Sequence, residues 1–151
     1  MITKEFLRSL LDATDWDDHV TFDDIEGFSM FHRIRLGYSG TQCTGYAISL
    51  GNLLREQGYE GPLEVMGRRF EDFRPEINCG GHDVLLVEDR WILDPWPREV
   101  PCFTLPDLYD TQDPQDLDKF VSSFGEFSKF SPTTRATELI GENKEIVCVD
   151  D

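Results

Sequence analysis

Residues 82–95 read His-Asp-Val-Leu-Leu-Val-Glu-Asp-Arg-Trp-Ile-Leu-Asp-Pro, and they carry the clearest strand pattern of the chain. The first part of this stretch, residues 82–87, is strongly strand-like because aliphatic residues follow the histidine and aspartate. A charged turn at 88–90 separates it from a second short strand at 91–93. Pro95 then ends the pairing, because proline cannot donate to a sheet ladder. The stretch predicts an antiparallel hairpin.

An amphipathic helix is predicted upstream of this hairpin, with Cys43 at its start. Apolar residues from position 44 onward recur at helical spacing, namely Tyr46, Ala47, Leu50, Leu53 and Leu54. Ser39 or Thr41 can cap the beginning, and Gly58 suits the left-handed conformation that ends a helix. A central helix together with antiparallel strands predicts an α+β fold.

The rest of the chain carries weaker patterns. Acidic residues and prolines interrupt the segment 106–118, and the segment 68–81 has the composition of a polar connection. No repeat or composition shift marks a second domain, so we expect a single domain over residues 1–151. The remaining expected elements are a helix over 2–11, a strand over 62–67, a short helix over 117–124 and a last strand over 145–149.

The charge of the chain is strongly negative. It has 14 basic and 30 acidic residues, which gives a formal net charge of −16. Such a surface repels nucleic acid and anionic membranes, and we expect neither as a partner. A solubilising surface is the favoured explanation, and an acidic docking face for a basic protein is the alternative.

The chain shows no signal peptide and no membrane-spanning stretch. We therefore expect a cytoplasmic protein, or one secreted without a cleavable signal peptide. Its four cysteines, Cys43, Cys79, Cys102 and Cys148, are irregularly spaced. Free thiols in a reducing compartment are the simplest interpretation of that spacing.

Cys43 is the first candidate for chemistry. A helix N-terminus carries partial positive charge and N–H groups without intrahelical partners, which stabilise an anionic thiolate. The same N–H groups can hold a developing oxyanion. A buried structural thiol is the common alternative for a lone cysteine.

His82 and Asp94 are the candidates that would complete a catalytic group. The hairpin places His82 opposite Asp94, or one pair off if the turn is shorter. A carboxylate there can hold one imidazole nitrogen and leave the other facing the thiol. The structural alternatives are a packed histidine and an aspartate that forms a turn before Pro95. Asp83 is a weaker rival, because successive strand residues point to opposite faces.

This order of parts resembles the transglutaminase-like branch of the papain-like superfamily. The resemblance rests on Cys43-Thr44-Gly45-Tyr46-Ala47 and on the histidine, turn, tryptophan and aspartate of residues 82–95. It implies that Cys43 is the nucleophile, His82 the general base and acid, and Asp94 the orienting carboxylate. It also implies a papain-like fold, with a central helix packed on an antiparallel sheet. Gln42 is a candidate for the second oxyanion donor.

The expected function is that of a thiol enzyme which acts on amide bonds through a thioester intermediate. A protein-glutamine deamidase or transglutaminase-like enzyme is favoured, with a protein or peptide bearing glutamine or another amide as substrate. A cysteine peptidase or amidase with the same triad is the alternative, and a non-catalytic acidic binding or inhibitor protein is a further one. No cofactor is expected, because the thiol chemistry needs none. No zinc site is expected either, since the pair Cys79 and His82 lacks the second pair of such a site.

Overall fold

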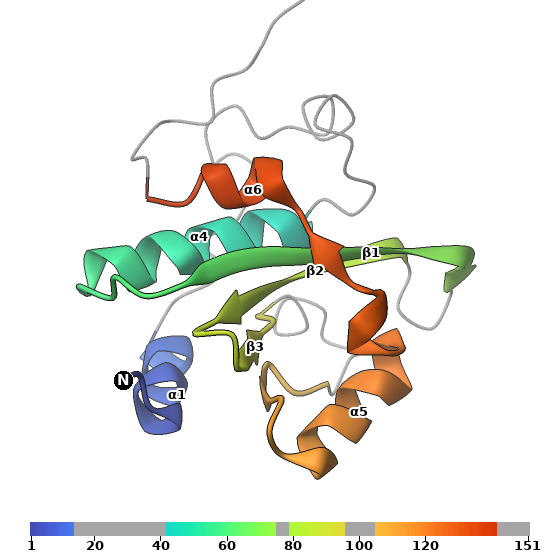
Figure 1. The fold of residues 1–151 in the computed structure, drawn as a ribbon, viewed down its shortest axis with the longest axis horizontal. Helices are drawn as coiled ribbons and strands as arrows, with labels where there is room; N and C mark the ends of the chain where they lie inside the picture. Colours follow the sequence, from blue (N-terminus) through green and yellow to red (C-terminus); the bar gives the residue numbers. More distant parts are fainter. Residues whose placement is uncertain (14–41, 75–78, 96–104, 142–151) are drawn as a thin grey trace, which may run out of the picture.

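The computed structural model describes residues 1–13, 42–74, 79–95 and 105–141, which form an α+β fold. Figure 1 shows helices α4 and α6 on one side of strands β1 and β2, and helix α5 on the other. All pairings in the five-stranded sheet are antiparallel, in the order β4-β3-β2-β1-β5. The α+β class and the antiparallel sheet are therefore confirmed. The strands are β1 Leu63–Arg74, β2 Cys79–Val87, β3 Trp91–Leu93, β4 Leu108–Asp110 and β5 Ser131–Pro132.

The helices lie before, between and after these strands in the chain. The described helical segments are α1 Lys4–Ala13, α4 Gln42–Glu56, α5 Pro114–Phe124, the 3-10 turn η2 Phe127–Lys129 and α6 Thr134–Glu138. Among them, none is long and apolar enough to cross a lipid bilayer. The strand expected at 145–149 lies outside the described residues.

The predicted hairpin is present as β2 and β3. In the register of this pair, Leu85 lies opposite Leu93, Leu86 opposite Ile92 and Val87 opposite Trp91. The turn is centred on Asp89, so the continued register puts Asp94 across from Val84. Asp94 and His82 are therefore one pair off rather than directly opposite. Diagonal neighbours on one face of a sheet remain within reach of long or aromatic side chains.

Helix α4 packs against β2 and β1 with its predicted apolar stripe. Ala47, Leu50 and Leu54 are buried. The helix ends in a Schellman motif, in which the N–H of Gly58 donates to Arg55 O at 3.1 Å and that of Tyr59 to Leu54 O at 3.0 Å. Gly58 has φ of +91°, as its predicted role requires. The start of α4 is thus held at a fixed place against the sheet.

Strand β1 is longer than its pattern predicted. The expected strand at 62–67 forms its first part, but residues 68–74 continue it and β2 already begins at Cys79. The expected polar connection over 68–81 is therefore wrong for most of its length. Arg68 explains how a charged residue fits there: it pairs with His82 across the sheet, and its Nη1 donates to Phe124 O at 3.0 Å.

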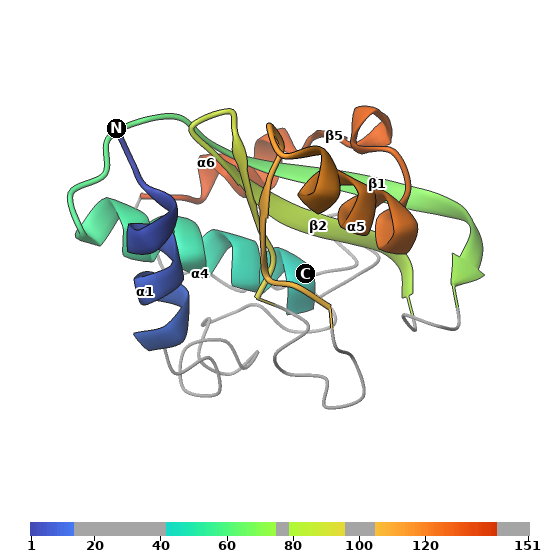
Figure 2. The same ribbon diagram turned by 90° about the horizontal axis from the view of Figure 1, so that it is seen from below.

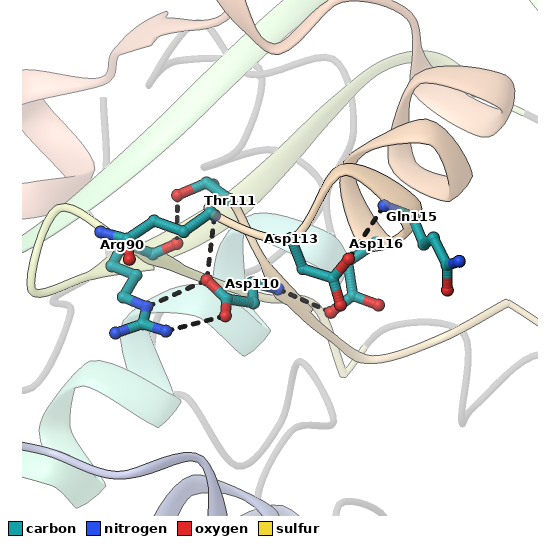
Figure 3. A network of polar contacts seen from close by, with 7 residues as sticks. Arg90, Asp110, Thr111, Asp113, Gln115 and Asp116 are labelled. Atoms are coloured by element: carbon teal, nitrogen blue, oxygen red, sulfur yellow. Dashed lines mark hydrogen bonds and ion pairs between the residues drawn. The ribbon is translucent and has the colours of Figure 1, made fainter.

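Helix α5 begins earlier than its apolar pattern indicated. Asp113 caps the helix by accepting the Gln115 N–H at 2.9 Å, and Pro114 takes the first turn. Proline suits that position because its missing N–H would have no intrahelical partner there. Figure 3 shows how this start is tied to the sheet. Arg90 makes a two-pronged contact with Asp110 at 3.0 and 2.9 Å, and the Asp110 N–H donates to Asp116 at 2.9 Å.

Helix α5 covers one face of the sheet, as seen from below in Figure 2, and it carries part of an aromatic cluster. Phe120 is fully buried at its centre. Its ring centroid lies 5.2 Å from Tyr109 and 5.3 Å from Phe124. Burial of a phenylalanine side chain contributes about 1.5–3 kcal/mol, so this cluster anchors α5 firmly. The anchored helix places Phe124 beside β2.

Helix α1 confirms the helix predicted over 2–11. Leu7 and Leu11 are fully buried, as their spacing of four requires. The N–H of Phe6 donates to the Thr3 hydroxyl at 3.1 Å, which caps the helix. Arg8 Nη1 lies 2.9 Å from Asp107 Oδ1 and ties α1 to the segment before β4.

Candidate active site

The His82 imidazole and the Asp94 carboxylate, predicted to be base and orienting group, meet in the interior. His82 Nε2 lies 2.6 Å from Asp94 Oδ2, and each side chain is 1% exposed. β2 supplies the imidazole, and the end of β3 supplies the carboxylate. The Asp94 N–H donates to Asp107 O at 2.9 Å, which fixes the backbone just beyond the strand. A short contact of this kind, out of water, holds the ring in one orientation.

The thiol reaches the same ring from α4. Cys43 is the second residue of that helix, is 5% exposed and carries a free thiol. The Cys43 side chain lies close enough to His82 to raise the pKa of the imidazole. Since Nε2 contacts Asp94, Nδ1 is the ring nitrogen left for the thiol. α4, β2 and β3 therefore bring sulfur, imidazole and carboxylate together.

The charge of His82 is set by opposing effects. Burial disfavours the imidazolium and alone would lower the pKa of His82, but the Asp94 charge, the Asp94 hydrogen bond and Cys43 together raise this pKa well above the ordinary value. The ring therefore keeps its proton to higher pH than an exposed histidine does. This is the charge state that pairs with a thiolate.

An aromatic ring fixes the plane of His82. Phe124 of α5 stacks on the imidazole with ring centroids 4.2 Å apart and planes 12° apart. Such a stack excludes water from one face of the ring and limits its rotation. No pattern in the sequence pointed to Phe124, because it is brought to His82 only by the packing of α5.

Tyr109 is a second buried polar group on this side of the sheet. It pairs with Ile92 across β3 and β4, which puts it on the face that also carries Asp94. Burial raises the pKa of Tyr109, and the charges of Asp94, Asp107 and Asp116 raise it further. Among the described residues, its hydroxyl has no hydrogen-bond partner.

Asp83 points the other way, as strand alternation predicts. Its Oδ2 accepts a hydrogen bond from the Thr44 hydroxyl on α4. Burial raises the pKa of Asp83, while the Thr44 bond, His82 and Arg69 counteract that effect. Thr44 itself is fully buried next to Cys43. Asp83 therefore bonds to α4 rather than to the imidazole.

Gln42 opens α4, but its side chain lies outside the described residues. Its expected part in an oxyanion hole stays a prediction. Within the described ranges, no group of three or more His, Cys, Asp or Glu side chains is placed to hold a metal ion. The chemistry available here is that of a thiol beside a protonatable imidazole.

The chain was also compared with known proteins. Searches against family models, curated proteins and solved structures find no match in any of the three.

Proposed function

We propose that the protein is a cysteine-dependent enzyme acting on amide bonds, with Cys43 as nucleophile, His82 as base and acid, and Asp94 as orienter. One observation carries the proposal: a free thiol at the start of a helix lies beside an imidazole and raises its pKa, and the Nε2 atom of that ring lies 2.6 Å from a buried carboxylate. The proposal includes a transglutaminase-like, papain-like fold. The packing of α4 on antiparallel β1 and β2 supports that likeness.

The proposed reaction has two halves. The Cys43 thiolate attacks the amide carbon, and the backbone N–H groups at the start of α4 face the developing oxyanion. The carbon–nitrogen bond breaks as His82 gives its proton to the departing ammonia or amine, which leaves a thioester. His82 then takes a proton from water, whose oxygen displaces the sulfur and yields a carboxylic acid. An incoming amine in place of water yields a new amide.

A glutamine side chain in a protein is the substrate that we favour. The likeness to transglutaminases in residues 43–47 and 82–95 supports it. The net charge of −16 would favour a substrate protein with a basic surface. A cysteine peptidase or an amidase would use the same three residues on a backbone or small-molecule amide.

Thiol labelling provides the first test. We expect iodoacetamide at about pH 6 to label Cys43 faster than the other three cysteines, because a protonated imidazole stabilises its thiolate. Peptide mapping by mass spectrometry gives the rate at each site. His82→Gln should slow labelling of Cys43 and leave the other rates unchanged. Equal rates at all four cysteines would contradict the proposal.

Substrate chemistry provides the second test. Incubation with glutamine-rich and basic proteins should add about 1 Da per site if the amide becomes an acid through a thioester. Added amine should instead be incorporated if the enzyme transfers acyl groups. Cys43→Ala should abolish either change. Backbone cleavage would replace the deamidase by the peptidase.

An acidic binding protein is the second candidate, favoured by the charge of −16. It predicts that Cys43→Ala retains full binding of a basic partner and that native Cys43 is no more reactive than the other thiols. Labelling therefore separates the two candidates before any substrate is known.

A further inference from the structure

Two neighbouring side-chain pairs join the start of α4 to β2. Cys43 lies beside His82 and raises the pKa of its ring, and the next residue along each element forms the second pair, in which the Thr44 hydroxyl donates to Asp83. Asp83 lies on the opposite face of β2 from His82, so it does not contact the imidazole–carboxylate pair itself. The second pair nevertheless sets where α4 begins relative to β2.

The surroundings of Asp83 are shaped to hold a carboxyl group. Gly67 pairs with Asp83 across the sheet. A Cβ at position 67 would collide with Asp83 Oδ1 and would lie 2.8 Å from the Thr133 hydroxyl oxygen. The missing side chain of Gly67 therefore leaves the space that the carboxyl group occupies. The hydroxyl of Thr44 supplies its hydrogen-bond donor from α4.

Burial at this position disfavours the charged form of the Asp83 carboxyl group. Burial raises the pKa of Asp83, with His82, Arg69 and Asp94 as the charged groups that act on it. A residue selected only for packing would not need a carboxyl group at this position. The hydrogen bond to α4 is what a carboxylate contributes here and an aliphatic residue does not.

We propose that Asp83 and Thr44 are positioning residues, which hold the start of α4, and with it the Cys43 sulfur, beside the His82 ring. This inference rests on the proposed function, because the geometry that it preserves is that of the nucleophile and its base. Neither residue is a catalytic residue. A shift of about 1 Å between reacting groups is enough to lower the rate about 100-fold. The loss of one hydrogen bond beside the thiol can therefore have a large effect on its reactivity.

The test measures Cys43 labelling by iodoacetamide across pH in a set of variants. Thr44→Val keeps the shape and removes the donor, and we expect it to slow labelling about tenfold and to alter its pH profile. Thr44→Ser keeps the donor and should restore the native rate and profile. Asp83→Ala should slow labelling as much as Thr44→Val does. The double variant should be no slower than either single one, since the two residues act as one unit.

Thr137→Val is the matched control. The Thr137 hydroxyl accepts the Val65 N–H at 2.9 Å and donates to Thr133 O at 3.0 Å, so it also joins a helix to the sheet. We expect this variant to lose stability in urea unfolding and to keep the native Cys43 labelling rate. If Thr44→Val does not fold, Asp83→Ala carries the test, because it removes a charge that burial disfavours.

The outcomes separate this inference from the proposed function. Slow labelling of Cys43 in the native protein would overturn the proposed function. Rapid native labelling that persists unchanged in Thr44→Val or Asp83→Ala would overturn only the positioning role. Multiplying effects in the double variant would also overturn it, because they would mean independent roles.

Discussion

Two opposing effects act on His82, and the balance between them is measurable. The raised pKa of the folded state means that the native protein binds a proton more tightly than the unfolded chain does. The stabilisation is therefore fully present below about pH 6.5, the ordinary histidine value, and is lost as pH rises through the folded-state pKa. We expect the stability difference between native protein and His82→Gln to shrink with rising pH in urea unfolding. A difference that grows would mean that burial outweighs Asp94.

Tyr109 offers a second test on a single side chain. Its hydroxyl is buried and has no partner among the described residues, which costs free energy in the folded state. We expect Tyr109→Phe to raise the free energy of unfolding by about 1 kcal/mol in urea titration. The control is Tyr59→Phe, because the Tyr59 hydroxyl donates to Pro62 O at 3.1 Å. That variant should bring no gain, and a loss in Tyr109→Phe would mean that its hydroxyl is paired.

The turn between β2 and β3 stores backbone strain. Glu88 and Asp89 both have φ of +55°, a region that side chains other than glycine disfavour. Asp89→Gly should stabilise the fold by about 1 kcal/mol, measured by thermal or urea unfolding. Gly58→Ala is the opposite case: φ is +91° and a new Cβ would meet nothing within 4 Å. It should destabilise by a similar amount through the backbone alone, and equal signs for the two variants would refute the strain argument.

Elements with strong periodicity could be predicted, and elements defined by long-range contacts could not. The hairpin and α4 follow from alternation and helical spacing in the chain itself. The continuation of β1 was missed because charged residues fill it, and the place of Arg68 depends on a carbonyl of α5. Pro114 indicates a break in regular structure when it is considered alone, but together with the Asp113 cap it marks the start of α5.

The candidate site divides in the same way. The hairpin pattern was enough to predict that His82 and Asp94 lie close together. The position of Cys43 at a helix start was enough to single it out as the third member of the group. Their catalytic role stays a prediction. The sequence could not predict the stacking of Phe124 or the Thr44–Asp83 bond, since both depend on how α5 and α4 pack on opposite faces of the sheet.

The charge of −16 acts on the whole molecule. Excess negative charge destabilises a compact chain, because the charges repel one another. Salt screens this repulsion, with a Debye length of about 8–10 Å at physiological ionic strength. We expect the melting temperature to rise by a few degrees between about 0.01 M and 0.15 M NaCl. A fall would mean that surface ion pairs, such as Arg90 with Asp110, outweigh the repulsion.

The network in Figure 3 has a consequence for how the protein tolerates substitution. It ties the end of the β2–β3 turn to the first turn of α5, whose last residue stacks on the imidazole. In a saturation screen for the proposed activity, Asp110 should therefore accept far fewer replacements than its partly exposed surface suggests. A substitution at Asp110 would loosen the start of α5 and thereby displace Phe124 from the His82 ring.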